Sequence, residues 1–307
     1  MIKFIYKSIR DKRTNKLDMP KKGTWVFAYD LTPEDISTLQ KMGLDEDILE
    51  DATDYFEVPR FEYFNGVSYL FTRFPVHHKT GELSTAPLLI AISENYIFTI
   101  SHKKADFLDD FAHNRKHLYT TQKVKSLLTI LDTIVLEYDT SLLKIRKDLI
   151  RYFAKLEKVS EAELKNLLAI ETTLADYISA MVPTYNALSA MLIKHKALTL
   201  RQEDMEILED LNQDINQSIG TARNIAKTAQ NIRSAHDVIL GHQLNTTMKT
   251  LTALTIIFTI PTIMTGLFGM NTWLPFSDGP ISFITIIFIT VLISFLVAKF
   301  FSKKGWI

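Results

Sequence analysis

The sequence predicts an α/β domain, then long helices, then a two-span transmembrane helical hairpin. Residues 1–120 alternate short runs of β-branched and aromatic residues with helix signals. From residue 121 the pattern turns helical, with few residues that stop a helix. Between Lys249 and Lys299 the only ionised side chain is Asp278 and nearly everything else is apolar, which indicates a membrane segment.

The composition fits a sizeable folded domain with a small membrane part. The chain has 307 residues, of which 47% are hydrophobic and 23% charged. The formal net charge is zero, which gives no support to a nucleic-acid partner, because such partners usually require a basic excess. There is no cysteine, which excludes disulfides, thiolate metal sites and cysteine nucleophiles. The first residues lack the features of a signal peptide, so the large domain is expected to stay inside the cell.

The α/β domain is expected to span residues 1–120. Its strands are predicted at 2–9, 24–29, 67–76, 87–92 and 96–100, where β-branched and aromatic residues gather. Asn65-Gly66 supplies a turn before the third of them. Thr32 and Pro33 are residue types that begin a helix, and acidic residues follow them in the first turn.

The next segment, 121–198, is predicted to be an antiparallel helical hairpin. One helix is expected at about 121–157. Ser160 and Glu163 form a capping box, which opens a second helix that reaches about Lys196.

A stalk helix is predicted to follow, with its cytosolic part at 199–250. Thr199 with Gln202 opens it, and no clear stop appears before Pro261. The pattern therefore predicts one helix from 200 to 268, on the order of 100 Å long. Apolar and small residues recur along it at threes and fours, so this face should pack on the preceding hairpin and on other copies of the chain.

The membrane hairpin is predicted at 251–301, with an outer loop at 269–280 and a basic tail at 302–307. Each apolar run has about the 20 residues that a spanning helix needs. Lysines flank both runs on one side, at Lys249, Lys299, Lys303 and Lys304, whereas the loop has no lysine or arginine. The positive-inside bias therefore places both termini in the cytoplasm, with the protein in the cell membrane.

The polar residues of the first span lie along one helix stripe that contains no large aliphatic residue. The stripe consists of Asn245, Met248, Thr252, Thr255, Thr259, Thr262 and Gly266. Two interpretations are open. The stripe could serve close helix packing, with each Thr satisfied on its own helix backbone. Alternatively, several copies of the helix surround an axis and present the stripe to a wet path, as pore linings do.

The residues that end this helix favour the second interpretation. They are Gly266-Leu-Phe-Gly269-Met270-Asn271, and a tryptophan-containing loop follows. Here the chain resembles the CorA family of divalent-cation channels, whose signature is Gly-Met-Asn at the outer end of the first of two C-terminal spans. The motif is preceded by Phe268 where the family commonly has tyrosine and followed by Thr272 where phenylalanine is common. These departures bear on ion preference, not on architecture.

The resemblance also covers the approach to the first span, 245–249, and the tail 303–307. The N-terminal order of a helix, Leu44 to Asp51, then Pro59-Arg60 and an aromatic strand is similar to the CorA N-terminal domain as well. This resemblance implies a funnel-shaped homo-oligomer, a pentamer, that takes up Mg²⁺, with Co²⁺ and Ni²⁺ as further candidate ions. Uptake would be driven by the membrane potential and gated by cytosolic Mg²⁺. Divalent metal ions, the lipid bilayer and other copies of the chain are then its partners.

The same resemblance assigns roles to individual residues. Gly269, Met270 and Asn271 would capture the ion, and the stripe would line the pore. Apart from the resemblance, the charge of Asp278 in the loop is expected to attract cations weakly to the mouth. An acid on the long helix contributes to a cytosolic Mg²⁺ site between subunits in this family, and Asp210 is the corresponding position.

The N-domain partner of Asp210 is expected among Asp106, Asp109 and Asp110. These three acids also suit the dipole of a helix N-terminus, which is the simpler interpretation. His113 and His117 stand at i and i+4, as metal ligands on one helix face do, but basic residues lie between them and no third ligand is evident. A structural role is therefore favoured for both histidines.

The sequence offers no sign of an enzyme. It has no phosphate-binding loop, no nucleophile elbow and no zinc-protease motif. Uptake need not use ATP, because an inside-negative membrane contributes roughly 2.3 kcal/mol per charge per 100 mV. The alternatives are a zinc transporter of the ZntB type, which shares the fold, and a sensor domain that the hairpin only tethers to the membrane.

Overall fold

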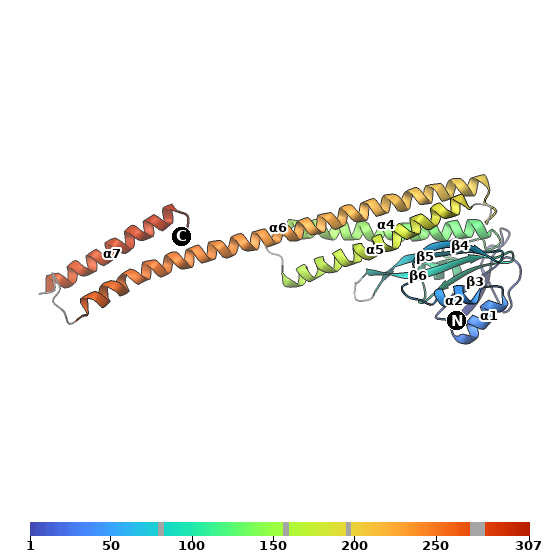
Figure 1. Ribbon diagram of the computed structural model, residues 1–307, viewed down its shortest axis with the longest axis horizontal. Coiled ribbons are helices and arrows are strands. Elements are labelled where there is room, and N and C mark those ends of the chain that lie inside the picture. Colours follow the sequence, from blue (N-terminus) through green and yellow to red (C-terminus); the bar gives the residue numbers. More distant parts are fainter. Residues whose placement is uncertain (79–82, 156–159, 195–197, 271–279) are drawn as a thin grey trace. The chain divides into compact units, whose positions relative to one another are not determined.

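The computed structural model describes residues 1–307 except 79–82, 156–159, 195–197 and 271–279 (Figure 1). The described chain forms two compact units, Met1–Arg233 and Ser234–Ile307. Their boundary falls inside one long helix, α6 (Gln202–Phe268). The finer division of the chain at residues 120, 198 and 250 stays a prediction.

The first unit is built on a seven-stranded sheet with the strand order β2-β1-β3-β7-β6-β5-β4. The strands are β1 (Ile2–Tyr6), β2 (Asn15–Leu17), β3 (Thr24–Tyr29), β4 (Arg60–Phe64), β5 (Val67–His77), β6 (Leu83–Ile92) and β7 (Tyr96–Ser101). The central pair, β3 and β7, is parallel, with Thr24 opposite Tyr96. The other neighbouring strands pair antiparallel.

All five predicted strands are present, and the sheet adds two that the sequence did not reveal. The added strands, β2 and β4, are the two edges of the sheet. They are short and carry polar or charged residues, as edge strands often do: β2 has three residues, and β4 has five, in which Phe61 is buried between the charged Arg60 and Glu62. The first strand is also shorter than predicted, because Ser8 begins a turn in which its backbone N–H donates to the Asp11 carboxylate at 2.8 Å.

Successive residues of each strand face two separate hydrophobic layers, as the pleat requires. Val26 and Ala28 pack in one layer with α1 (Pro33–Lys41) and α2 (Glu46–Asp51). Trp25 and Phe27 pack in the other layer with α3 (Asp106–Ala112), α4 (Lys123–Ala154), α5 (Glu161–Ile193) and the first part of α6. Figure 1 shows α4 and α5 running along this second face. The first unit is therefore a sheet covered by helices on both faces.

Of the three helix starts that capping residues predicted, two are confirmed and one is wrong. Ser160 accepts a hydrogen bond from the Glu163 N–H at 3.3 Å, and the Glu163 carboxylate accepts one from the Ser160 N–H at 2.8 Å. Thr32 begins α1 in the same way. Thr199, however, does not cap α6.

The long helix begins at Gln202, where the side chain of Asp204, and not that of Thr199, bonds to the backbone at the start of the helix. The buried Asp204 carboxylate accepts a hydrogen bond from the Arg201 N–H at 3.1 Å. Thr199 lies outside the helix with a positive φ of 50°. From Gln202 the helix then continues without a break to Phe268, as predicted.

The second unit contains the rest of α6 and α7 (Pro280–Lys303). Both helices have a segment long and apolar enough to cross a membrane, the second of them at Phe283–Lys303. The helix α7 returns beside the C-terminal part of α6 (Figure 1). A hydrogen bond of 2.9 Å from the Thr250 hydroxyl to the Trp306 carbonyl joins α6 to the tail that follows α7.

Candidate functional site

The predicted stripe on α6 is exposed along its whole length in the single chain. Exposed residues are Asn245, Met248, Thr252, Thr255, Thr259, Thr262 and Gly266. Three of their hydroxyls donate to the carbonyl one turn earlier on the same helix: Thr255 to Leu251 at 2.8 Å, Thr259 to Thr255 at 2.7 Å and Thr262 to Phe258 at 3.1 Å. The hydrogen of each hydroxyl is thus engaged, while lone pairs of its oxygen remain available to accept.

The opposite side of the same helix carries α7 and the C-terminal tail. Ala253 is fully buried there. The remaining residues of this side are partly buried: Ile257, Ile260, Pro261, Met264 and Phe268. Counting about 100° per residue, this side points roughly 160° away from the stripe. The stripe therefore lies in the middle of the broad face of α6 that its own hairpin leaves uncovered, and exposed apolar residues flank it on both sides.

The described part of the Gly-Met-Asn motif continues the helix by one turn. The Gly269 N–H donates to the Thr265 carbonyl at 3.0 Å, and the Met270 N–H donates to the Leu267 carbonyl at 3.4 Å. A β-carbon on Gly269 would lie 3.0 Å from the Thr265 carbonyl oxygen, so only glycine fits without a shift. Asn271 and Asp278, which were also predicted to act here, lie outside the described residues.

The structure separates the three acids of the N-terminal domain by their partners. Asp109 is the most enclosed of them, and its carboxylate contacts Lys104 at 2.9 Å, His113 at 3.2 Å and Lys3 at 3.9 Å. Asp110 pairs with Arg115 at 3.0 Å. Within the described part of the chain Asp106 makes no ion pair, and its side chain is exposed. Asp106 is therefore the acid of the three that keeps a free carboxylate.

Asp109 is held in its charged form by these neighbours. Partial burial disfavours the carboxylate, but the hydrogen bond from Lys104 and the other nearby cations outweigh it, so the pKa of Asp109 lies below its ordinary value. Lys3 comes from β1, far from Asp109 in the sequence. No sequence pattern reveals such a pairing, which depends on the fold that brings β1 beside α3.

Asp210 lies on α6 with an exposed side chain, and within the described residues it makes no ion pair. No group of three or more histidine, aspartate or glutamate side chains comes together there as a metal site. The chain by itself thus supplies separate acids rather than a finished metal site.

His113 and His117 do not share a helix face. The helix α3 ends at Ala112, and Asn114 has a positive φ of 59°, which turns the chain away. His113 contacts the Asp109 carboxylate, whereas the His117 ring nitrogen Nδ1 lies 3.5 Å from the buried Lys7 ammonium. The two histidines belong to different contacts, in agreement with the structural role favoured for them.

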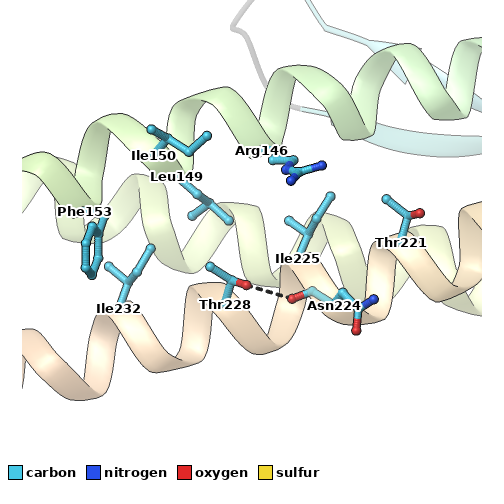
Figure 2. Close-up of a pocket in the computed structure, with 9 residues that line it drawn as sticks. All are labelled: Arg146, Leu149, Ile150, Phe153, Thr221, Asn224, Ile225, Thr228 and Ile232. Carbon is cyan, nitrogen blue, oxygen red and sulfur yellow. Dashed lines mark hydrogen bonds between the residues drawn. The ribbon is translucent and has the colours of Figure 1, made fainter.

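A pocket of about 560 Å³ lies between α4 and α6 in the first unit (Figure 2). Its walls are mainly aliphatic and aromatic, and they include Leu149, Phe153 and Ile232. Among the residues that line it, Arg146 is the charged one, and no acid is present. This pocket therefore offers no ligand set for a divalent cation, and none of the predicted site residues lines it.

Comparison with known proteins shows that most of the chain is similar to one family of transporters. The family described as CorA-like Mg²⁺ transporter protein matches residues 20–304. The cobalt/magnesium transport protein CorA of Methanocaldococcus jannaschii is 28% identical over 300 residues, which is 92% of this chain and 91% of that protein. The protein of the same name from Thermotoga maritima is 19% identical over 267 residues, 85% of this chain and 76% of that protein.

The fold is also similar to that of a solved structure over the whole chain. The complete structure of the CorA magnesium transporter from Methanocaldococcus jannaschii superposes with a TM-score of 0.85 and 23% identity. That match covers 100% of this chain and 99% of the other. The predicted architecture of an α/β domain, long helices and two apolar C-terminal helices is thereby confirmed.

Asp109→Asn is expected to lower the melting temperature at neutral pH, because it removes the charge that Lys104 and His113 contact. The free energy of unfolding should fall by roughly 1–3 kcal/mol. A carboxyl with a lowered pKa stabilises the fold above its unfolded pKa, and that contribution disappears as pH falls through the folded pKa. The difference from wild type should therefore be full well above pH 3.8 and shrink below it. Circular-dichroism melts across pH measure this difference, and exposed Asp106→Asn is the matched control. Equal melting temperatures of wild type and Asp109→Asn at neutral pH would contradict the assignment.

Proposed function

The chain belongs to the family of CorA-like Mg²⁺ transporter proteins, and on this premise we propose that it forms a homo-oligomeric channel through which Mg²⁺ crosses the cell membrane. Membership of a transporter family agrees with the lack of enzyme motifs in the sequence. The observation that carries the proposal is the position of the stripe. It is polar, exposed, and turned away from α7, as a surface that meets other copies around an axis would be.

The chemistry of the stripe supports a hydrated cation as the cargo. Mg²⁺ prefers octahedral oxygen ligation and gives up its water reluctantly. The bound waters of a cation point their hydrogens outward, so they need acceptors. Thr255, Thr259 and Thr262 have donated their own hydrogens to the helix and present oxygens. Rings of such oxygens would accept from the water shell without the full charge that would trap a divalent ion.

The outer end of the path is proposed to capture the ion. Several copies of Asn271 would form a ring of carboxamide oxygens, with Gly269 carbonyls beside them, to accept hydrogen bonds from the hydrated ion. Asp278 in the outer loop would add a weaker, screened attraction that concentrates cations at the mouth. The alternative role for Asn271 is to end the helix, because asparagine tolerates a left-handed turn.

The driving force and the gate follow from the proposed orientation, with both termini in the cytoplasm. The membrane potential contributes roughly 4.6 kcal/mol for a divalent ion at 100 mV, enough for strong accumulation without ATP. An open path would then overload the cell. A cytosolic Mg²⁺ ion held between Asp210 of one copy and Asp106 of the next would offset carboxylate repulsion and favour a closed arrangement.

Two other functions are distinguished by one experiment. Both relatives are named cobalt/magnesium transport proteins, so Co²⁺ is the second ion to test, with Ni²⁺ beside it. A zinc transporter of the same fold would prefer Zn²⁺, and a tethered sensor would move no ion. Uptake of Mg²⁺ into proteoliposomes, with Co²⁺, Ni²⁺ and Zn²⁺ as competitors, separates the three. Absence of uptake of all these ions by well-assembled protein would rule out the channel.

Cysteine scanning of α6 should mark the stripe as the water-filled face. The chain has no cysteine of its own, so single substitutions give a clean signal. In the assembled protein, water-soluble thiol reagents should modify cysteines at Thr252 and Thr259 several times faster than cysteines at Phe258 and Ile263. Mass spectrometry of labelled protein measures the rates. Equal rates at all four positions would show that the stripe does not line a path.

Asn271→Ala is expected to reduce Mg²⁺ uptake to near background, because the ring that holds the hydrated ion loses its acceptors. Oligomer size and melting temperature should stay close to wild type. The matched control is Asn231→Ala, which alters an exposed asparagine in the cytosolic part of α6. Near-normal uptake by assembled Asn271→Ala protein would remove this residue from ion capture.

Asp210→Ala should weaken the protection that Mg²⁺ gives the first unit against proteolysis, since one ligand of the regulatory ion is lost. The expected result is a several-fold rise in the Mg²⁺ concentration needed for half protection. Glu209→Ala, the neighbouring exposed acid, is the matched control. Protection curves that coincide for Asp210→Ala and wild type would exclude Asp210 from the sensor.

A further inference from the structure

A second pocket lies inside the membrane hairpin itself. It has a volume of about 610 Å³ and lies between the last turns of α6 and the first half of α7. Its floor is apolar and includes Pro261 and Met264 from α6 and Ile286 from α7. Among the described residues, none that lines it is charged. Water therefore gains little by entering, and an apolar group is needed to fill the space.

The pocket opens on one flank of the hairpin, between the stripe and α7. The rim on α6 is formed by Thr265 and Gly269, and the rim on α7 by Ile287 and Val291, which are 47% and 61% exposed. Thr265 and Gly269 stand four residues apart, which is the spacing of small residues where membrane helices approach each other closely. The α6 rim lies roughly 90° from the centre of the stripe.

The other flank of α6 carries the complementary shape. Ile256, Ile263 and Leu267 are 41%, 54% and 46% exposed and lie roughly 70° to the other side of the stripe. Ile263 and Leu267 stand at the same level along the helix as the pocket, whose α6 lining runs from Pro261 to Gly269. One flank thus offers aliphatic projections and the other offers a hollow at the same height.

A projection and a hollow on opposite flanks, at one height, suit a closed ring of identical chains. In such a ring each copy contacts the next head to tail, so the two surfaces differ and complement each other. Cyclic symmetry keeps equivalent residues at equal height, which matches the level shared by Ile263, Leu267 and the pocket. With the stripe turned to the axis, the two flanks point to the two neighbours.

We propose that the pocket between α6 and α7 is a socket that receives Ile263 and Leu267 of the neighbouring copy. The inference rests on the proposed homo-oligomeric channel and adds the contact by which its membrane part assembles. Inside a bilayer, burial from water supplies no driving force between helices, so close packing must hold them together. A lipid acyl chain is the rival occupant, but it needs no small residues at the rim, whereas a helix does.

Disulfide trapping tests the socket directly. Ile263→Cys/Val291→Cys places one thiol on the projecting flank and one at the mouth of the socket, and these two positions lie on opposite sides of one hairpin. Mild oxidation of the assembled protein in liposomes should therefore link different copies into a ladder of oligomers on a denaturing gel. The matched control is Ile263→Cys/Phe288→Cys, in which the second thiol lies on an exposed part of α7 that does not line the pocket. A trapped fraction no greater than in this control would overturn the socket.

A filling variant tests the same contact without crosslinking. Val291→Trp should block the mouth and weaken the oligomer in gel filtration, whereas Phe288→Trp should leave it unchanged. An intact oligomer with Val291→Trp would assign the pocket to lipid instead. Mg²⁺ uptake by the reduced double-cysteine protein is measured in parallel. If the double-cysteine protein takes up Mg²⁺ but is not trapped, the socket is rejected and the channel is not. If it is trapped while the cysteine-free parent takes up no Mg²⁺, the assembly is supported and the channel is rejected.

Discussion

The cost of leaving a backbone amide or carbonyl unpaired in hydrocarbon governs the second unit of this protein. Each such group costs several kcal/mol, so a chain that crosses a bilayer alone must do so as a helix that satisfies itself. The helix α6 is unbroken from Gln202 to Phe268, so its backbone groups bond to one another. The hydroxyls of Thr255 and Thr259 also donate to carbonyls one turn earlier on the same helix. Only after the backbone is satisfied can a polar stripe run through an apolar span. The stripe, the apolar face under α7 and the socket are three sides of one helix that obeys this constraint.

In the first unit a different constraint applies: a charge that is largely buried needs neighbouring groups that stabilise it. Asp109 contacts two lysines, Lys3 and Lys104, and the ring of His113, while Asp106 and Asp210 remain on the surface. A carboxylate that is already neutralised has little to gain from a metal ion, whereas free carboxylates on separate elements repel one another when copies meet. The distribution of ion pairs therefore divides structural acids from those available to a cation.

Much of this fold could be predicted from the sequence because its signals are local. Capping residues such as Ser160 and the unbroken apolar run of the first span need no tertiary context, and the Gly-Met-Asn motif is contiguous. The edge strands β2 and β4 were not predicted, because edge strands can be short and charged, and three or five residues give too short a pattern to identify a strand. The start of α6 was wrongly predicted at Thr199. Thr199 lies outside the helix, and the buried Asp204 carboxylate accepts the hydrogen bond from the Arg201 N–H at the start of the helix. The pairing of Lys3 with Asp109, and the alignment of a hollow with two aliphatic residues, depend on distances that only folding creates.

The way the threonines of the stripe bond to their own helix has a consequence for proton chemistry. A lining made of carboxylates or histidines changes its charge with acidity, and so would a path that they form. None of the residues from Asn245 to Gly266 in the stripe is a titrating group, and the hydroxyl hydrogens of Thr255, Thr259 and Thr262 are held by carbonyls. The attraction of this surface for positive charge comes from fixed dipoles. It should therefore remain constant when the pH of the surrounding water changes.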